Sequence, residues 1–301
     1  MTVVNSFYRN PNALAYATQL FSASSPARQQ SESAPAWDRQ DDPVFTETAG
    51  QKALARITEI LALRDTPAGD QASVDESLGY ITAAQGSEGD DTLTFDASAI
   101  YNVDTGGGAD KVAARTAAIA GLSTGAGNDS LAATARYIAD VDMGDGDDEL
   151  KLSGRLVMNV TGGEGNDSLT VAGYALVGID GGDGDDTMVL EGTRIFASGG
   201  TGNDTVTIKR TDIKSDNAIA EYGFARGDSE DTIISNGALT LRFDGYAESD
   251  VAVSVTGNTL TATFAGSSDK ITLTIDDAAL SDKGLTYGFA LDGGRTVLKI
   301  G

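Results

Sequence analysis

The stretch GGEGNDSLTVAGYALVGIDGGDGDDTMVL, residues 162–190, contains one full unit of a repeat and the start of the next. A glycine-rich turn closes at Asp167 and is followed by alternating apolar and polar residues, a small corner and a second apolar segment. The turn then returns and closes at Asp186, 19 residues later. One turn with two alternating segments is typical of one coil of a stacked parallel β-structure.

The same turn recurs along about 40 % of the chain. Seven copies lie at residues 86–91, 105–110, 124–129, 143–148, 162–167, 181–186 and 199–204. The closing aspartates are spaced by 19 residues five times and by 18 once, and a weaker copy follows at 226–231. Chance does not keep such a register, so we interpret these residues as stacked coils.

The segments between the turns carry apolar residues in fixed columns. One column stands two residues past each aspartate: Leu93, Val112, Leu131, Leu150, Leu169, Met188 and Val206. Another lies on the second segment: Ile100, Ile119, Ile138, Val157, Leu176, Ile195 and Ile213. Alternation with the same inward face in every repeat predicts two strands per coil. We therefore expect an all-β, right-handed parallel β-roll or β-solenoid with about 19 residues per coil.

Composition excludes several classes of protein. The 301 residues include 45 Asp and Glu against 21 Lys and Arg, a net charge of -24 that disfavours nucleic acid as a partner. No apolar run approaches the length of about 20 residues that spans a bilayer. With no cysteine or histidine, thiolate nucleophiles, Cys-based zinc sites and Ser-His-Asp triads are impossible, so GLSTG at 121–125 is no lipase nucleophile. We expect no enzyme.

The file of stacked aspartates points to a cation. Gly-Asx corners also form ordinary tight turns, and a single one carries little information. Seven carboxylates in register, a few ångströms apart, repel one another unless a cation lies between them. Calcium takes oxygen ligands only, and this chain is rich in them.

The turns match the nonapeptide G-G-x-G-x-D-x-U-x, best at residues 162–170 and 181–189. The chain therefore resembles the RTX, or haemolysin-type, calcium-binding proteins that type I systems secrete. This resemblance implies that each ion lies between consecutive turns, held by both aspartates and by backbone carbonyls. It assigns the metal site to Asp91, Gly106, Gly108, Asp110, Gly125, Gly127, Asp129, Gly144, Asp145, Gly146, Asp148, Gly162, Gly163, Glu164, Gly165, Asp167, Gly181, Gly182, Asp183, Gly184, Asp186, Gly199, Gly200, Thr201, Gly202 and Asp204.

The repeat is nearly twice as long as the usual nonapeptide period, and the opposite corners lack the motif. We therefore expect about six to eight Ca²⁺ ions along one edge only. The resemblance implies a secreted protein of a Gram-negative cell surface or extracellular matrix that folds on binding calcium after export. A structural protein that forms homo-oligomers or a self-assembled array is our first hypothesis. The alternative is an extracellular enzyme or accessory module acting on polysaccharide, and cell-surface polysaccharide is a further candidate partner.

The flanking regions differ from the repeats, so we divide the chain into residues 1–84, 85–234 and 235–301. The first part predicts an arm or linker with a helix over 48–63, which either caps the roll or docks on a neighbouring subunit. The last part predicts antiparallel strands at 251–255, 259–264 and 270–275 and a final hairpin around 292–294, and it is where RTX proteins carry an uncleaved secretion signal. The tripeptide RGD at 226–228 is also an integrin motif, but it is common by chance.

Overall fold

The computed structural model describes residues 73–211, 218–277 and 284–301. The chain divides into two units, 1–48 and 49–301, and all described residues belong to the second. The helix and linker predicted near the N-terminus, and the choice between a cap and an arm, lie outside the described residues.

The described chain is all-β, as predicted. Its helical content is the short 3₁₀ turn η2, Glu248–Asp250. The strands are β1 Ser73–Thr82, β2 Gln85–Ser87, β3 Thr92–Gly106, β4 Lys111–Arg115, β5 Ala118–Ser123, β6 Ser130–Thr134, β7 Tyr137–Asp145, β8 Glu149–Glu164, β9 Ser168–Asp183, β10 Thr187–Thr201, β11 Thr205–Arg210, β12 Ile219–Ala225, β13 Glu230–Ser235, β14 Leu239–Asp244, β15 Val251–Thr256, β16 Thr259–Phe264, β17 Lys270–Ile275, β18 Tyr287–Asp292 and β19 Arg295–Ile300.

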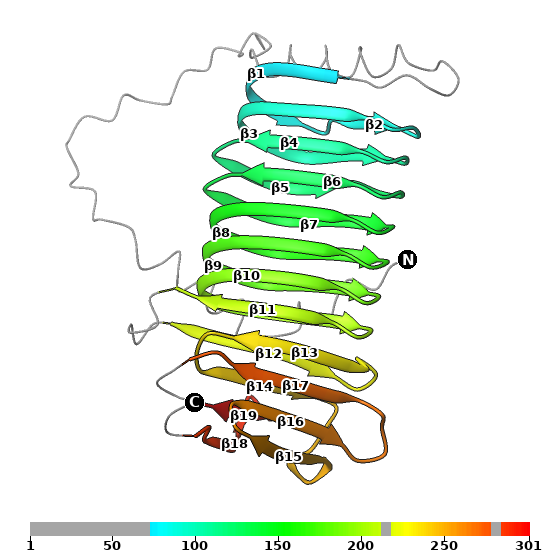
Figure 1. The fold of residues 1–301 in the computed structure, drawn as a ribbon. Helices are drawn as coiled ribbons and strands as arrows, with labels where there is room; N and C mark the ends of the chain where they lie inside the picture. Colours follow the sequence, from blue (N-terminus) through cyan, green and yellow to red (C-terminus); the bar gives the residue numbers. More distant parts are fainter. Residues whose placement is uncertain (1–72, 212–217, 278–283) are drawn as a thin grey trace, which may run out of the picture. The chain divides into compact units, whose positions relative to one another are not determined.

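The coils stack in parallel, one repeat apart, as Figure 1 shows. Leu93 of β3 lies opposite Val112 of β4, and Val112 lies opposite Leu131 of β6. The second segment keeps the same step, because Ile100 lies opposite Ile119 of β5. The predicted solenoid with its 19-residue spacing is therefore confirmed. Parallel pairing also joins β1 to β3 and β12 to β14, so the ladder starts at Ser73 and runs to Asp244.

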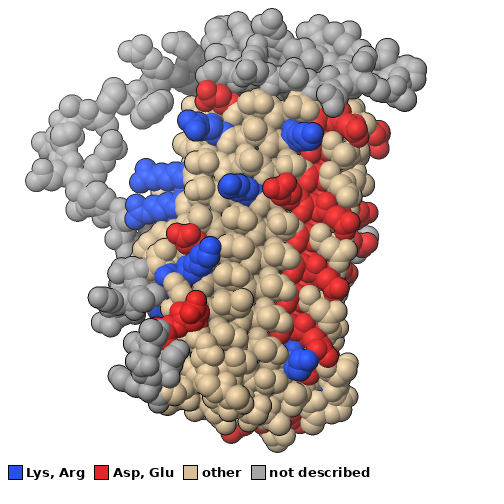
Figure 2. Space-filling model, in the orientation of Figure 1, with Lys and Arg blue, Asp and Glu red and all other residues tan. Residues whose placement is uncertain are grey.

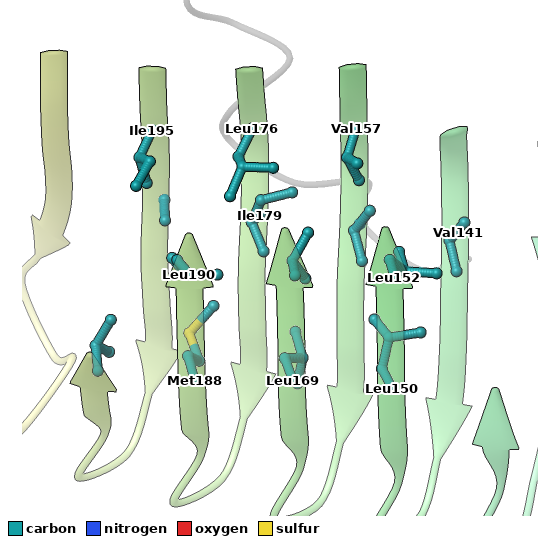
Figure 3. Close-up of a cluster of buried hydrophobic side chains, with 14 of the residues drawn as sticks. Val141, Leu150, Leu152, Val157, Leu169, Leu176, Ile179, Met188, Leu190 and Ile195 are labelled. Carbon is teal, nitrogen blue, oxygen red and sulfur yellow. The ribbon is translucent and has the colours of Figure 1, made fainter. Parts of the chain in front are cut away.

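The core is made of the predicted apolar columns. Leu150, Leu169 and Met188 form one file, and Val157, Leu176 and Ile195 form a second file that faces it across the coil (Figure 3). All six side chains are buried. Burial of one such side chain contributes about 1.5–3 kcal/mol, and a single coil gains this only when its neighbours cover it.

The C-terminal strands close the stack with antiparallel pairs, as predicted. β15 pairs with β16, β16 with β17, and β18 with β19. β17 also pairs in parallel with β13, so it joins the coils to the antiparallel cap. Phe264 of β16 contacts Phe224 at 5.0 Å, Phe243 at 5.3 Å and Tyr246 at 4.3 Å between ring centroids. This aromatic cluster covers the end of the aliphatic core.

Candidate metal centre

The structure brings all the predicted site residues to one edge of the stack. Gly144, Gly163, Gly182 and Gly200 lie opposite one another in successive coils, and so do Asp145, Glu164, Asp183 and Thr201. The four glycines stand at the second position of their turns. Asp145, Glu164, Asp183 and Thr201 stand at the third position. The third-position side chains are exposed, and the Thr201 hydroxyl donates to Oδ1 of Asp183 in the preceding turn at 2.8 Å.

Glycine is required at the second and fourth positions of the turn. Gly163 has φ +118°, and a Cβ there would lie 1.8 Å from the carbonyl oxygen of Gly144. Gly165 has φ +126°, and a Cβ there would lie 2.2 Å from the carbonyl oxygen of Gly146. Positive φ and contact with the preceding turn both exclude a side chain. The glycines of the motif therefore let consecutive turns stack closely.

The closing aspartates form a buried hydrogen-bond ladder. The backbone N–H of Asp110 donates to Oδ1 of Asp129 at 2.7 Å, and the N–H of Asp129 donates to Oδ1 of Asp148 at 2.7 Å. The same link joins every aspartate of the series from Asp91 to Asp231, at 2.7–3.2 Å. One oxygen of each carboxylate from Asp110 onwards is thus used to hold adjacent coils in register.

The second carboxylate oxygen has a different environment. Among the described residues, Oδ2 has no hydrogen-bond partner in six aspartates: Asp110, Asp129, Asp148, Asp167, Asp186 and Asp204. Each of these side chains is at most 4 % exposed. A buried carboxylate oxygen without a partner is costly, and the cost is removed by a cation or by protonation.

Burial shifts the acidity of these groups accordingly. It raises the pKa of Asp110 to about 6, of Asp148 to about 7 and of Asp186 to about 8. Burial also raises the pKa of Asp129 and of Asp167. The Thr105 hydroxyl at Asp110, the Thr124 hydroxyl at Asp129 and the ladder hydrogen bonds oppose the rise. Neighbouring aspartates add to it through repulsion in most of the series. The ladder is therefore stabilised either by protonation of these carboxylates or by a compensating positive charge.

Oxygens converge at two places in the ladder. A Cβ added at Gly162 would lie 2.2 Å from Oδ2 of Asp167 and 2.4 Å from the carbonyl oxygen of Gly181. A Cβ added at Gly181 would lie 2.2 Å from Oδ2 of Asp186 and 2.3 Å from the carbonyl oxygen of Gly199. In both cases a carboxylate oxygen and the carbonyl oxygen of the next turn lie against the glycine, where a Cβ would collide with both unless they shifted.

These donors fit calcium. Within 73–211, 218–277 and 284–301, no three acidic side chains gather closely enough to hold a metal by themselves. Any ion in the ladder therefore needs backbone carbonyls beside the carboxylates, and calcium accepts such mixed oxygen sets. The carbonyls of the second and third turn residues also accept inter-turn hydrogen bonds, for example from Ala126 N–H to Gly106 at 3.1 Å and from Gly127 N–H to Asp145 at 2.7 Å.

The same edge carries a strip of exposed acidic residues, visible on the right of Figure 2. Its members include Glu88, Asp90, Asp145, Asp147, Glu164, Asp183 and Asp185. Most of the Lys and Arg in this view lie away from that strip (Figure 2). The strip gives the edge a negative field that attracts cations.

Sequence reasoning missed two features of the turns. The fifth position forms an outer ladder, in which Asn166 N–H donates to Oδ1 of Asp147 at 2.8 Å and Asp185 N–H donates to Oδ1 of Asn166 at 2.9 Å. The column of Asp and Asn at this position could have revealed it. The first position carries buried side chains at Thr105, Thr124 and Met143, where Gly162 and Gly181 have none.

The weaker eighth copy closes the ladder. Asp231, with Oδ1 on the N–H of Asp204, takes the place of a closing aspartate, and its Oδ2 accepts the Tyr222 hydroxyl at 2.7 Å. Asp228 of the RGD tripeptide is buried, and its carboxylate accepts the Ala225 N–H. Arg226 of the same tripeptide lies over the Tyr246 ring. Arg226 and Gly227 are thus exposed in a turn, whereas the Asp228 carboxylate is withdrawn from the surface.

In comparisons with known proteins, no family model and no curated protein matches the chain. Among the described residues, no helix is long and apolar enough to cross a membrane.

Proposed function

We propose that this chain is a calcium-stabilised structural solenoid that works outside the cell. The observation that carries the proposal is the file of buried aspartates whose Oδ2 atoms have no partner within the described residues and which, at Gly162 and Gly181, converge with carbonyl oxygens. The motif at 162–170 and 181–189, with its resemblance to RTX proteins, supports calcium as the ion.

An extracellular place of action belongs to the proposal, because calcium sites as weak as those of extracellular modules would fill only outside the cell. Extracellular calcium modules bind with dissociation constants of about 10⁻⁴–10⁻³ M. Such sites stay empty at cytosolic calcium and fill outside, so uptake after export stabilises the folded coils. The resemblance supports type I secretion from a Gram-negative bacterium as the route. A structural role rather than catalysis belongs to the proposal, because the chain has no histidine or cysteine.

Self-assembly is the further part of this proposal. The acidic strip, which includes Asp147, Glu164 and Asp183, keeps copies of the chain apart while it is uncompensated. Calcium bound along the edge lowers that repulsion, so association of copies follows calcium. Homo-oligomers or an array are the expected product.

The test is a calcium titration of the full chain after removal of metal. Calorimetry measures binding, circular dichroism measures β-content and melting temperature, and light scattering measures association. We expect binding with a rise in melting temperature, and scattering that increases with calcium but not with magnesium. A chain that binds no calcium and melts at the same temperature in chelator would refute the proposal.

A polysaccharide-binding role is the second candidate, because aromatic and basic residues are exposed away from the turns. Tyr137 and Tyr174 are 40 % and 41 % exposed. Arg136 lies 5.6 Å from the Tyr137 ring centroid, and the N–H of the exposed Arg155 donates to the carbonyl of Arg136. Aromatic faces with arginines suit acidic sugars. Affinity for an acidic polysaccharide that is lost in Tyr137→Ala/Tyr174→Ala would support it.

A further inference from the structure

The first residue of each turn decides whether the space beside the closing aspartate is open. At Gly162 and Gly181 no side chain stands there, and a carboxylate oxygen and a carbonyl oxygen both lie within 2.4 Å of the position that a Cβ would take. Neither glycine has the positive φ that excludes side chains. A threonine at these two positions therefore meets no φ penalty, but both oxygens would have to shift to admit its Cβ.

Threonine fills the equivalent space in the second and third turns. The Thr105 hydroxyl donates to the carbonyl of Thr124 at 2.8 Å and also lies close enough to Asp110 to lower the pKa of that carboxyl. The Thr124 hydroxyl donates to the carbonyl of Met143 at 2.6 Å and lies close enough to Asp129 to lower the pKa of that carboxyl. Each hydroxyl thus stands between the two oxygens that a cation would bridge, and a hydroxyl hydrogen can rotate to serve either oxygen.

The remaining interfaces are closed in other ways. The first-position side chain of the fourth turn, Met143, is fully buried, and a thioether is no ligand for a hard cation. In the first turn the Asp91 carboxylate turns to Ser87, whose N–H and hydroxyl donate to it at 2.7 and 3.0 Å. After Gly199 the Tyr222 hydroxyl enters the space and accepts the Gly199 N–H at 2.9 Å.

We propose that calcium is confined to two interfaces, between the turns that start at Gly162 and Gly181 and between those that start at Gly181 and Gly199. Thr105 and Thr124 act as built-in substitutes for the ion and hold their turns together without metal. This inference rests on the proposed function and narrows it from about six to eight ions to two.

The physical reason is the competition between a hydroxyl and a cation for the same oxygens. The threonine hydroxyl is covalently attached and always present, so it stabilises the turn at any calcium concentration. Its oxygen and methyl group fill volume that calcium needs for six to eight oxygen ligands. The ion would have to expel a buried side chain whose hydrogen bond is already made, whereas at Gly162 and Gly181 it expels none.

The experiment counts calcium ions bound by the full chain, with native mass spectrometry and calorimetry, in the wild type and three double variants. Thr105→Gly/Thr124→Gly opens two spaces. Thr105→Val/Thr124→Val is its matched control, because it removes the hydroxyl but keeps the volume. Gly162→Thr/Gly181→Thr places a threonine at the position that Thr105 and Thr124 hold in the earlier turns, and it requires the two neighbouring oxygens to shift. Circular dichroism in chelator reports the metal-free fold of each variant.

We expect two ions in the wild type, four in the glycine variant, two in the valine variant and none in Gly162→Thr/Gly181→Thr. Two results would overturn this inference and leave the proposed function standing. One is six or more calcium ions bound by the wild type. The other is a wild type that binds calcium together with a glycine variant that binds no additional ions. No ions in either the wild type or the glycine variant would overturn both.

Discussion

At the scale of single residues, Asp186 occupies a central place because it belongs to both open interfaces. Its Oδ1 accepts the Asp167 N–H at 2.7 Å, while its Oδ2 points at the space beside Gly181. Asparagine keeps an oxygen for the ladder and removes the charge. In Asp186, Oδ1 thus holds the register of adjacent coils, and Oδ2 is the oxygen available to a cation.

For Asp186→Asn we expect calcium affinity to fall about tenfold or more at both sites, because affinity follows the charge count of the ligands. In chelator the variant should melt at or above the wild-type temperature, since a buried uncompensated charge has been removed. Calorimetry and thermal melts measure the two effects. Asp110→Asn, at a threonine-filled turn, is the control and should leave calcium binding unchanged; equal losses in the two variants would contradict this assignment.

Gly163 tests the requirement for glycine in the turn. Gly163→Ala places a Cβ 1.8 Å from the Gly144 carbonyl at φ +118°. A side chain in that region costs about 1–3 kcal/mol before the clash is added. We expect a loss of at least that size in the free energy of unfolding, measured with denaturant. Gly288→Ala, where no atom lies within 4 Å, should change stability by much less.

At the scale of elements, the two halves of the solenoid should respond differently to calcium. Hydrogen bonds join the turns at the open interfaces. The Asp167 N–H donates to Oδ1 of Asp186, and the Gly165 N–H donates to the carbonyl of Asp183, both at 2.7 Å. The link from Asp110 N–H to Asp129 belongs to a turn with a threonine bridge. Without calcium, hydrogen exchange should accelerate in β9 and β10 and stay slow in β4–β7. Uniform acceleration along all coils would contradict the division.

The strands of this fold could be predicted from sequence because their information is local. The columns through Leu150 and Val157 fix which face of each strand is buried, and the 19-residue step fixes the register. The predicted strands at 259–264 and 270–275 match β16 and β17 to the residue. The extension of parallel pairing to β14 was not predicted, because a strand's alternation does not identify its partner.

The site was less predictable for a physical reason. The motif identifies Asp110 and Asp186 as equivalent, yet their surroundings differ through Thr105 and Gly181, five residues earlier in each turn. A consensus treats the first position as a place where glycine is preferred. Only the stacked geometry shows that a side chain there stands between a carboxylate and the next turn's carbonyl.

At the scale of the whole described solenoid, two ions set how strongly stability depends on calcium. At ten times the dissociation constant, each independent site contributes about 1.4 kcal/mol. Two sites contribute about 3 kcal/mol, against about 5–15 kcal/mol for a typical domain. Calcium should therefore raise the melting temperature by several degrees without creating the fold. The threonine-bridged coils and the aromatic cap would remain folded in chelator.

Protons should partly replace calcium in the metal-free chain. Burial raises the folded-state pKa of Asp110 to about 6, of Asp148 to about 7 and of Asp186 to about 8. An aspartate in the unfolded chain has a pKa of about 3.9. Between these values the folded state binds more protons than the unfolded state. The free energy of unfolding therefore falls as pH rises from about 4 to about 8.

We expect the melting temperature in chelator to be higher at pH 5 than at pH 8, the reverse of ordinary acid denaturation. Calcium added at pH 8 should restore the part of the difference that comes from Asp167, Asp186 and Asp204 at the two open interfaces. Calcium added at pH 5 should do little, because protons already occupy these carboxylates. Asp186→Asn should flatten the pH dependence in chelator, since one of the most shifted groups is gone. A metal-free melting temperature that stays constant or rises from pH 5 to pH 8 would show that the buried aspartates carry no uncompensated charge. In that case this edge of the solenoid would not need a cation.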